Sequence, residues 1–268
     1  FILALAPLYI FWLRPIGTDD LSIFVALGRD TLQKFSLITT DTYAFTDTQT
    51  HFIYPILTTL FYGVLNQIGG LDLVVFLHAF VPAVWVYIWY QKIRSARNSD
   101  LTFWNSKTFL LFIFSLCGLF MIYSPRPALL VSPLVLLSYS WLARKSFFRK
   151  RDFISFFILQ IFWVNMHGSF LILPVLILWK SGSYFLRKRF FKFFNSLYLT
   201  FTVLVASLIN PFGYEIFDYS FFTARISKAR DLFEWRPPHT FDYPFSSVLF
   251  YSLSLFVVSC FFKQIKKN

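Results

Sequence analysis

The sequence predicts an all-α, polytopic integral membrane protein with about eight transmembrane helices. Of its 268 residues, 57% are hydrophobic, and the apolar residues gather in runs that approach the roughly 20 residues needed to cross a bilayer. Clusters of lysine and arginine follow the ends of these runs, which is typical of cytoplasmic loops. We therefore expect one transmembrane domain over residues 1–268 and no separate soluble domain.

The formal net charge is +12. In a soluble protein this excess would favour a nucleic-acid partner. Here the basic residues flank apolar runs, where anionic lipid headgroups account for them. We therefore expect membrane lipids as partners and no nucleic acid. Cys117 and Cys260 fall inside apolar runs and are interpreted as packing residues.

Placing the basic clusters in one compartment pairs the transmembrane segments that lie between them. The predicted pairs are 1–13 with 71–91, 110–123 with 128–143, 153–163 with 169–180, and 197–209 with 246–262. The segments 153–163 and 169–180 are short for a bilayer core of about 30 Å, so we expect a tight hairpin there.

The remaining segments form loops on the outer face. The first outer loop, 14–53, contains an amphipathic helix at about 21–35, and an interfacial helix follows at 54–68. Gly69-Gly70 is expected to break the chain before the next span. The last outer loop is 211–244. In this topology only Asp100 and Asp152 of the 13 acidic residues face the cytoplasm, so the candidate chemistry gathers on the outer face.

The acidic pair Asp19-Asp20 follows the first span and opens the amphipathic helix. A carboxylate at the outer face could act as a general base on an incoming hydroxyl. Helix capping explains one aspartate equally well, because carboxylates stabilise the positive start of a helix. Both interpretations stay open.

The stretch WVNMHGSF, residues 163–170, places Asn165 and His167 inside a long apolar tract. A broken backbone at Gly168 would expose the amide groups of a helix that begins at Ser169, beside His and Asn. This arrangement suits an anion such as a lipid phosphate. The alternative is that both side chains cap the helices of a tight hairpin.

Two further loops carry candidate residues. Arg126 lies between two prolines in a short outer loop, where it could grip a phosphate or reach lipid headgroups. Glu234-Trp235 lies in the last outer loop and suits a sugar, although an interfacial Trp is also common. The turn residues of 210–213, NPFG, are interpreted as the end of a span.

In order along the chain, these motifs resemble C-type glycosyltransferases, the polytopic enzymes that use lipid-phosphate-linked sugars. A closer resemblance is to poorly characterised bacterial membrane proteins with D-x-D, T-D-x-[FY], R-P, W-x-N-x-H-G, L-x-N-P-x-G and E-W motifs. The matching residues here are Asp20, 40–46, Arg126-Pro127, 163–168, 208–213 and Glu234-Trp235. The polar residues of the family's first loop are replaced by Ser22-Ile23-Phe24 and by 53–56, IYPI.

The resemblance implies transfer of a sugar from a polyprenyl-phosphate donor to an acceptor outside the bacterial inner membrane. It implies Asp20 as the general base and Asp41 as its support. The donor phosphate would be held by Arg126 and His167, with Asn165 orienting His167. Glu234 and Trp235 would line the acceptor side.

A divalent cation beside the acidic pair fits this chemistry, but no ligand set for it stands out in the sequence. The replaced first-loop residues leave an alternative: a non-catalytic membrane subunit of a larger complex that has kept the scaffold.

Overall fold

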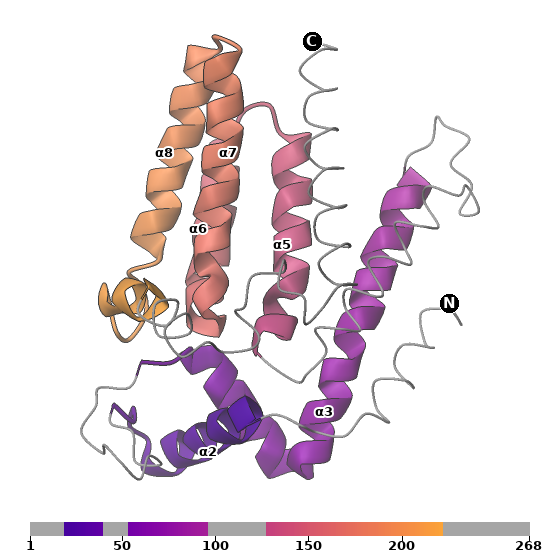
Figure 1. Cartoon of the computed structure of the whole chain (residues 1–268), viewed down its shortest axis with the longest axis vertical. Coiled ribbons are helices and arrows are strands. Elements are labelled where there is room, and N and C mark those ends of the chain that lie inside the picture. Colours follow the sequence, from indigo (N-terminus) through magenta and orange to yellow (C-terminus); the bar gives the residue numbers. More distant parts are fainter. Residues whose placement is uncertain (1–18, 40–52, 96–126, 222–268) are drawn as a thin grey trace, which may run out of the picture. The chain divides into compact units, whose positions relative to one another are not determined.

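The computed structural model describes residues 19–39, 53–95 and 127–221, and every regular element in these ranges is helical (Figure 1). The helices are α2 (Asp19–Lys34), α3 (Ile56–Ser95), α5 (Pro127–Arg144), α6 (Lys150–Met166), η1 (Gly168–Leu171), α7 (Ile172–Leu186) and α8 (Phe190–Ala206). The all-α class is thus confirmed for the described residues. The predicted spans at 1–13, 110–123 and 246–262 lie outside them.

The compact unit Phe1–Asp218 contains each of the helices named above, and a second unit comprises Tyr219–Asn268. The single-domain organisation stays a prediction.

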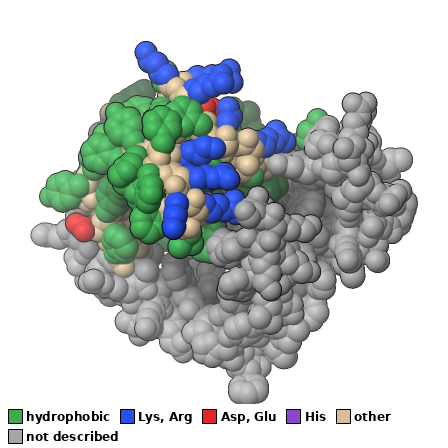
Figure 2. Space-filling view, turned by 90° about the horizontal axis from the view of Figure 1, so that it is seen from above, with side chains coloured by type: hydrophobic (Ala, Val, Ile, Leu, Met, Phe, Trp, Pro, Cys, Tyr) green, Lys and Arg blue, Asp and Glu red, His purple; other side chains and the backbone are tan. Residues whose placement is uncertain are grey.

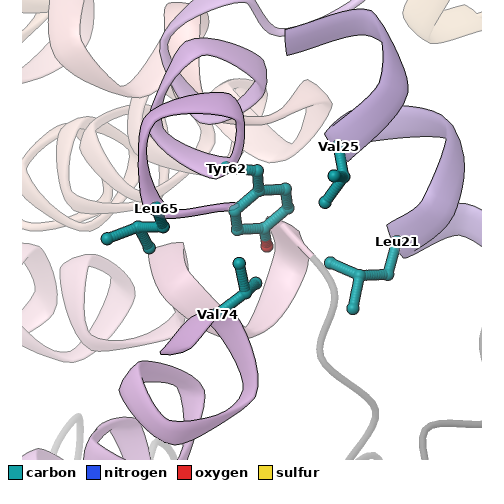
Figure 3. Packing of buried hydrophobic residues seen from close by; sticks show 5 residues of the cluster. All are labelled: Leu21, Val25, Tyr62, Leu65 and Val74. Atoms are coloured by element: carbon teal, nitrogen blue, oxygen red, sulfur yellow. The ribbon is translucent and has the colours of Figure 1, made fainter. Parts of the chain in front are cut away.

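The amphipathic helix predicted in the first outer loop is α2, which packs on the first half of α3. Leu21 and Val25 of α2 lie against Tyr62, Leu65 and Val74 of α3 in one buried cluster (Figure 3).

Further along the contact, α2 and α3 cross at Gly28 and Gly63. A Cβ added to Gly28 would lie 2.1 Å from the Thr59 carbonyl oxygen and 2.8 Å from the Gly63 nitrogen. The two backbones touch there because neither glycine has a side chain.

A sharp bend divides α3 at Gly69-Gly70, as the two glycines predicted. Gly70 has a φ of +67°, a conformation that other residues rarely adopt. Across the bend, the Tyr62 hydroxyl is 2.8 Å from Nε2 of His78, whose Nδ1 lies 2.8 Å from the Val74 carbonyl oxygen. The segment before the bend is therefore fixed to the segment after it by buried polar contacts.

Helices α5 to α8 form a bundle in which α8 packs on both α7 and α6, and α5 contacts α7 (Figure 1). Their mutual core contains Phe156, Trp163, Leu173, Ile177 and Leu199, each at most 1% exposed. Helix α6 has 17 residues, so at about 1.5 Å per residue it is roughly 25 Å long. This is longer than the apolar run 153–163, because charged residues at its start and polar residues at its end also adopt helical structure.

Two described stretches, Ile56–His78 and Gly168–Leu186, are long and apolar enough to cross a bilayer, judged by length and composition. The shorter helices Leu130–Arg144 and Phe190–Ala206 are also apolar. The stretch Ile56–His78 includes the bend, so it combines most of the helix predicted at 54–68 with the start of the span predicted at 71–91.

Candidate functional site

The chain between α6 and α7 turns at His167. This residue is extended, with φ −167° and ψ 146°, so it ends α6 and opens η1. Its N–H donates to the Trp163 carbonyl oxygen at 3.0 Å, and its Nδ1 accepts from the N–H of Ser169 at 3.0 Å. The break predicted at Gly168 therefore lies one residue earlier, because the imidazole can cap the next helix from position 167.

The bond from Ser169 fixes the tautomer of His167. Since Nδ1 accepts a hydrogen bond, the ring proton of a neutral His167 is on Nε2. Burial lowers the pKa of His167 to about 4, so the ring is neutral at pH 7. No described residue accepts a hydrogen bond from Nε2. The side chain thus offers one N–H donor and no positive charge.

Asn165 is buried and is bonded away from His167. Its Nδ2 donates to the Ile161 carbonyl oxygen at 2.8 Å and to the Ile209 carbonyl oxygen at 2.9 Å. The second bond joins the end of α6 to the chain just after α8. Asn165 therefore holds two helix ends together. The family resemblance had instead implied that Asn165 orients His167.

The turn is also joined to Trp163 and to α3. Trp163 Nε1 donates to Ser169 Oγ at 3.1 Å. The hydroxyl of Thr58, in the first turn of α3, donates to the Met166 carbonyl oxygen at 2.6 Å. These bonds place the start of α3 directly beside the turn.

The motif NPFG forms a tight turn after α8. The Asn210 amide donates to the carbonyl oxygens of Ser207 and Gly213, at 2.8 and 2.9 Å, and its Oδ1 accepts from the N–H of Phe212 at 2.8 Å. Gly213 has a φ of +55°. Phe212 packs edge-on against Tyr54, with ring centroids 5.7 Å apart. The interpretation of this motif as a structural termination agrees with this geometry.

The structure brings only some predicted site residues together. His167 and Asn165 share the turn. Asp20 lies in the first turn of α2, and its neighbour Leu21 packs beside Leu65 and Val74, toward the bend in α3.

Gly28, later in α2, lies beside Thr59, the neighbour of the residue that bonds to the turn. The positions of Asp41, Arg126, Glu234 and Trp235 lie outside the described residues.

Sequence analysis did not identify the polar residues that support the turn from inside the bundle. Buried Gln160 donates to the Phe170 carbonyl oxygen at 3.2 Å and to Ser207 Oγ at 2.7 Å. Thr58 is fully buried as well. An isolated Gln or Thr in an apolar run is the one signal that could have indicated them, since such residues need partners when buried.

The turn can therefore present a neutral imidazole N–H to an oxygen atom of a ligand, such as a phosphate oxygen. With a pKa of about 4, His167 carries no positive charge at pH 7, so it would contact a phosphate as a hydrogen-bond donor alone. Among the described residues, no group of three or more His, Cys, Asp or Glu is placed to hold a metal ion. Comparisons with family models, curated proteins and solved structures found no significant match.

Proposed function

We propose that this chain is an integral membrane protein that transfers a sugar from a polyprenyl-phosphate donor to an acceptor on the extracytoplasmic face of a bacterial inner membrane. The observation that supports this most directly is His167. Its Nδ1 accepts from the Ser169 N–H, which leaves Nε2–H as a donor in a turn where Asn165 Nδ2 and Ser169 Oγ are already bonded. Hydrogen-bond donors placed in this way can bind the phosphate that leaves during transfer.

The membrane part of the proposal is supported by α8. Its exposed face carries a helical stripe of apolar side chains: Phe190, Phe194, Leu197, Phe201 and Val205. Phe194 and Phe201 are each more than 60% exposed. Large apolar patches of this kind indicate contact with lipid or protein. With the apolar helices α5 and α7, this stripe is consistent with the eight-crossing topology.

The proposed roles follow from charge. Because His167 is neutral, the negative charge of the donor phosphate needs a cation, and Arg126 is the residue that the motif supplies. Asp20 would take the proton of the acceptor hydroxyl, with Asp41 as its support. Glu234 and Trp235 would line the acceptor side. The first half of α3 contacts both α2, whose first turn contains Asp20, and the turn with His167.

The first experiment tests phosphate-lipid binding at His167. Asparagine can keep the bond from the Ser169 N–H through its Oδ1 but has no group at the position of Nε2–H. We expect His167→Asn to retain the fold and to bind polyprenyl phosphate in nanodiscs about 10-fold more weakly, which corresponds to one hydrogen bond to a charged group. Unchanged affinity in a folded His167→Asn protein would contradict the assignment.

The second experiment tests chemistry. Asp20→Asn should abolish sugar transfer from polyprenyl-phosphate donors in reconstituted vesicles. Asp30→Asn, on the same helix beside Arg29, is the matched control and should leave transfer intact. If both variants behave alike, Asp20 is not the general base.

A non-catalytic membrane subunit is the second candidate, and one observation favours it. Asn165 and Nδ1 of His167 bond to backbone atoms, so much of the turn is explained by structural support alone. For this function, Asp20→Asn would change the size of a complex extracted in mild detergent and leave lipid binding as in the wild type.

A further inference from the structure

We propose that the other end of the α5–α8 bundle is a binding surface for anionic phospholipid. The headgroup phosphate would bind between the α5–α6 and α7–α8 connections, and the acyl chains would lie along the exposed face of α8. This inference rests on the membrane part of the proposed function and is independent of sugar transfer.

The surface, here named the basic collar, consists of exposed lysines and arginines at the ends of four helices. Figure 2 shows them gathered over this end of the molecule. They are Arg144, Arg149, Lys150, Arg151, Arg187, Lys188 and Arg189.

The collar is almost without acidic residues. From residue 127 to residue 214 the sequence contains one, Asp152. Its carboxylate is buried, lies 3.0 Å from Lys145 Nζ and accepts the N–H of Arg149 at 2.9 Å. The charge of Asp152 is thus paired with Lys145, which is not one of the collar cations. The collar charges are therefore available to a ligand with several negative charges or to a charged surface.

The two connections form one surface because they are bonded to each other. The Phe148 N–H donates to Asn195 Oδ1 at 2.9 Å, and Asn195 Nδ2 donates back to the Phe148 carbonyl oxygen at 3.2 Å. Phe147 stacks on Phe191 with ring centroids 5.4 Å apart and planes at 4°. The Tyr184 hydroxyl donates to the Ser146 carbonyl oxygen at 3.0 Å. Cations from α5–α6 and α7–α8 are thereby held near one another.

An apolar face begins at the collar and continues along α8. Phe190, in the first position of the helix, is 52% exposed, and Phe194, one turn further, is 62% exposed. A phospholipid matches this arrangement, because its charged head and apolar chains are adjacent in the same order. A nucleic acid would contact the cations and leave the aromatic face uncovered.

The experiment uses the full chain in detergent and measures lipid binding by native mass spectrometry. Phosphatidylglycerol and phosphatidylcholine with identical acyl chains are compared. We expect phosphatidylglycerol to bind at least about 10-fold more tightly. Equal affinity for the two lipids would overturn the proposal.

The collar is then altered without changing buried residues. We expect the triple variant Arg187→Gln/Lys188→Gln/Arg189→Gln to lose about 10–100-fold in affinity for phosphatidylglycerol, since each cation contributes to binding. The charge-preserving variant Arg187→Lys/Arg189→Lys should keep the preference. Lys34→Gln removes an exposed cation of α2 and should have no effect. Retained preference in the triple glutamine variant would overturn the proposal.

The lipid source and the competing ligands are tested separately. Displacement of phosphatidylglycerol by millimolar inorganic phosphate would assign the surface to free phosphate, and tighter binding of an RNA oligonucleotide would assign it to nucleic acid. Either result overturns the proposal. If the chain retained no phospholipid at all, the membrane part of the proposed function would be refuted as well. If it bound both phospholipids without preferring phosphatidylglycerol, only the proposed lipid site at the collar would be refuted.

Discussion

The two ends of α6 use polar side chains under different constraints. At its start, Asp152 carries a charge that is satisfied by Lys145 and by a backbone N–H, and exposed cations surround the pair. At its end, Asn165 and His167 are uncharged at neutral pH and bond to backbone atoms. The start of α6 therefore holds charge where water or headgroups can solvate it. At the end of α6, neutral side chains form hydrogen bonds with backbone groups that the helix end leaves free.

The difference shows where each kind of chemistry can occur. A cluster of cations attracts anions broadly, whereas the turn at His167 offers a single donor in a fixed direction. The two ends should also respond to acid in different pH ranges, since His167 and Asp152 have different titration behaviour.

The largest effect is expected where α2 crosses α3, close to the His167 end. Gly28→Ala places a methyl group 2.1 Å from the Thr59 carbonyl oxygen, which is backbone and cannot rotate away. We expect the free energy of unfolding to fall by more than about 3 kcal/mol, measured by thermal unfolding in detergent.

Gly182→Ala is the matched control, because a Cβ there meets nothing within 4 Å and the position is helical. We expect it to be neutral or to stabilise the protein by up to about 1 kcal/mol. Equal destabilisation by the two substitutions would show that the α2–α3 crossing is not close.

The second prediction concerns acid sensitivity at the His167 turn. The folded pKa of about 4 lies below the ordinary value of 6.5, so the unfolded chain takes up the proton first. The stability present above pH 6.5 is therefore lost as the pH falls toward 4, by up to about 3 kcal/mol. Unfolding monitored by tryptophan fluorescence at stepwise pH would measure this loss.

His167→Asn isolates that contribution, because asparagine does not titrate and can accept the Ser169 N–H. We expect the stability of the variant to be nearly independent of pH between 6.5 and 4. At neutral pH the substitution should cost about 1 kcal/mol of stability or less. A wild-type slope that survives in the variant would mean that another group is responsible.

The third prediction addresses the other end of α6. Burial raises the pKa of Asp152, but bonds from the Arg149 N–H and from Lys145 outweigh this and hold it below the ordinary 3.8. Its contribution is therefore present above pH 3.8 and lost below it, a lower range than that of His167. We expect Asp152→Asn to cost about 2 kcal/mol at neutral pH. The substitution should also remove the loss of stability that occurs below pH 3.8, measured by unfolding at stepwise pH.

The sequence predicted most helices because their signals are local. Apolar periodicity located α2, and two adjacent glycines located the bend in α3. Helix ends were less accurate: α7 continues to Leu186, and α8 begins at Phe190, before the predicted 197. Charged and aromatic residues at these ends remain helical because packing at the collar stabilises them.

The candidate site was predictable only in part. The polar stretch around His167 was identified because polar residues are costly in an apolar tract. The partners of Asn165 could not be predicted, since Ile209 lies 44 residues away and contributes a backbone oxygen. Likewise, nothing local in α3 indicates that Thr58 reaches Met166 across 108 residues. Such contacts depend on the tertiary arrangement.

The smallest expected effect tests whether the collar is one surface. Phe147 and Phe191 are stacked but exposed, so each single change to leucine should cost less than about 1 kcal/mol. In a double-mutant cycle we expect a coupling of about 0.5–1 kcal/mol, read from unfolding in detergent. A coupling near zero would mean that the α5–α6 and α7–α8 connections move independently. The collar cations would then act as two separate groups rather than as one surface.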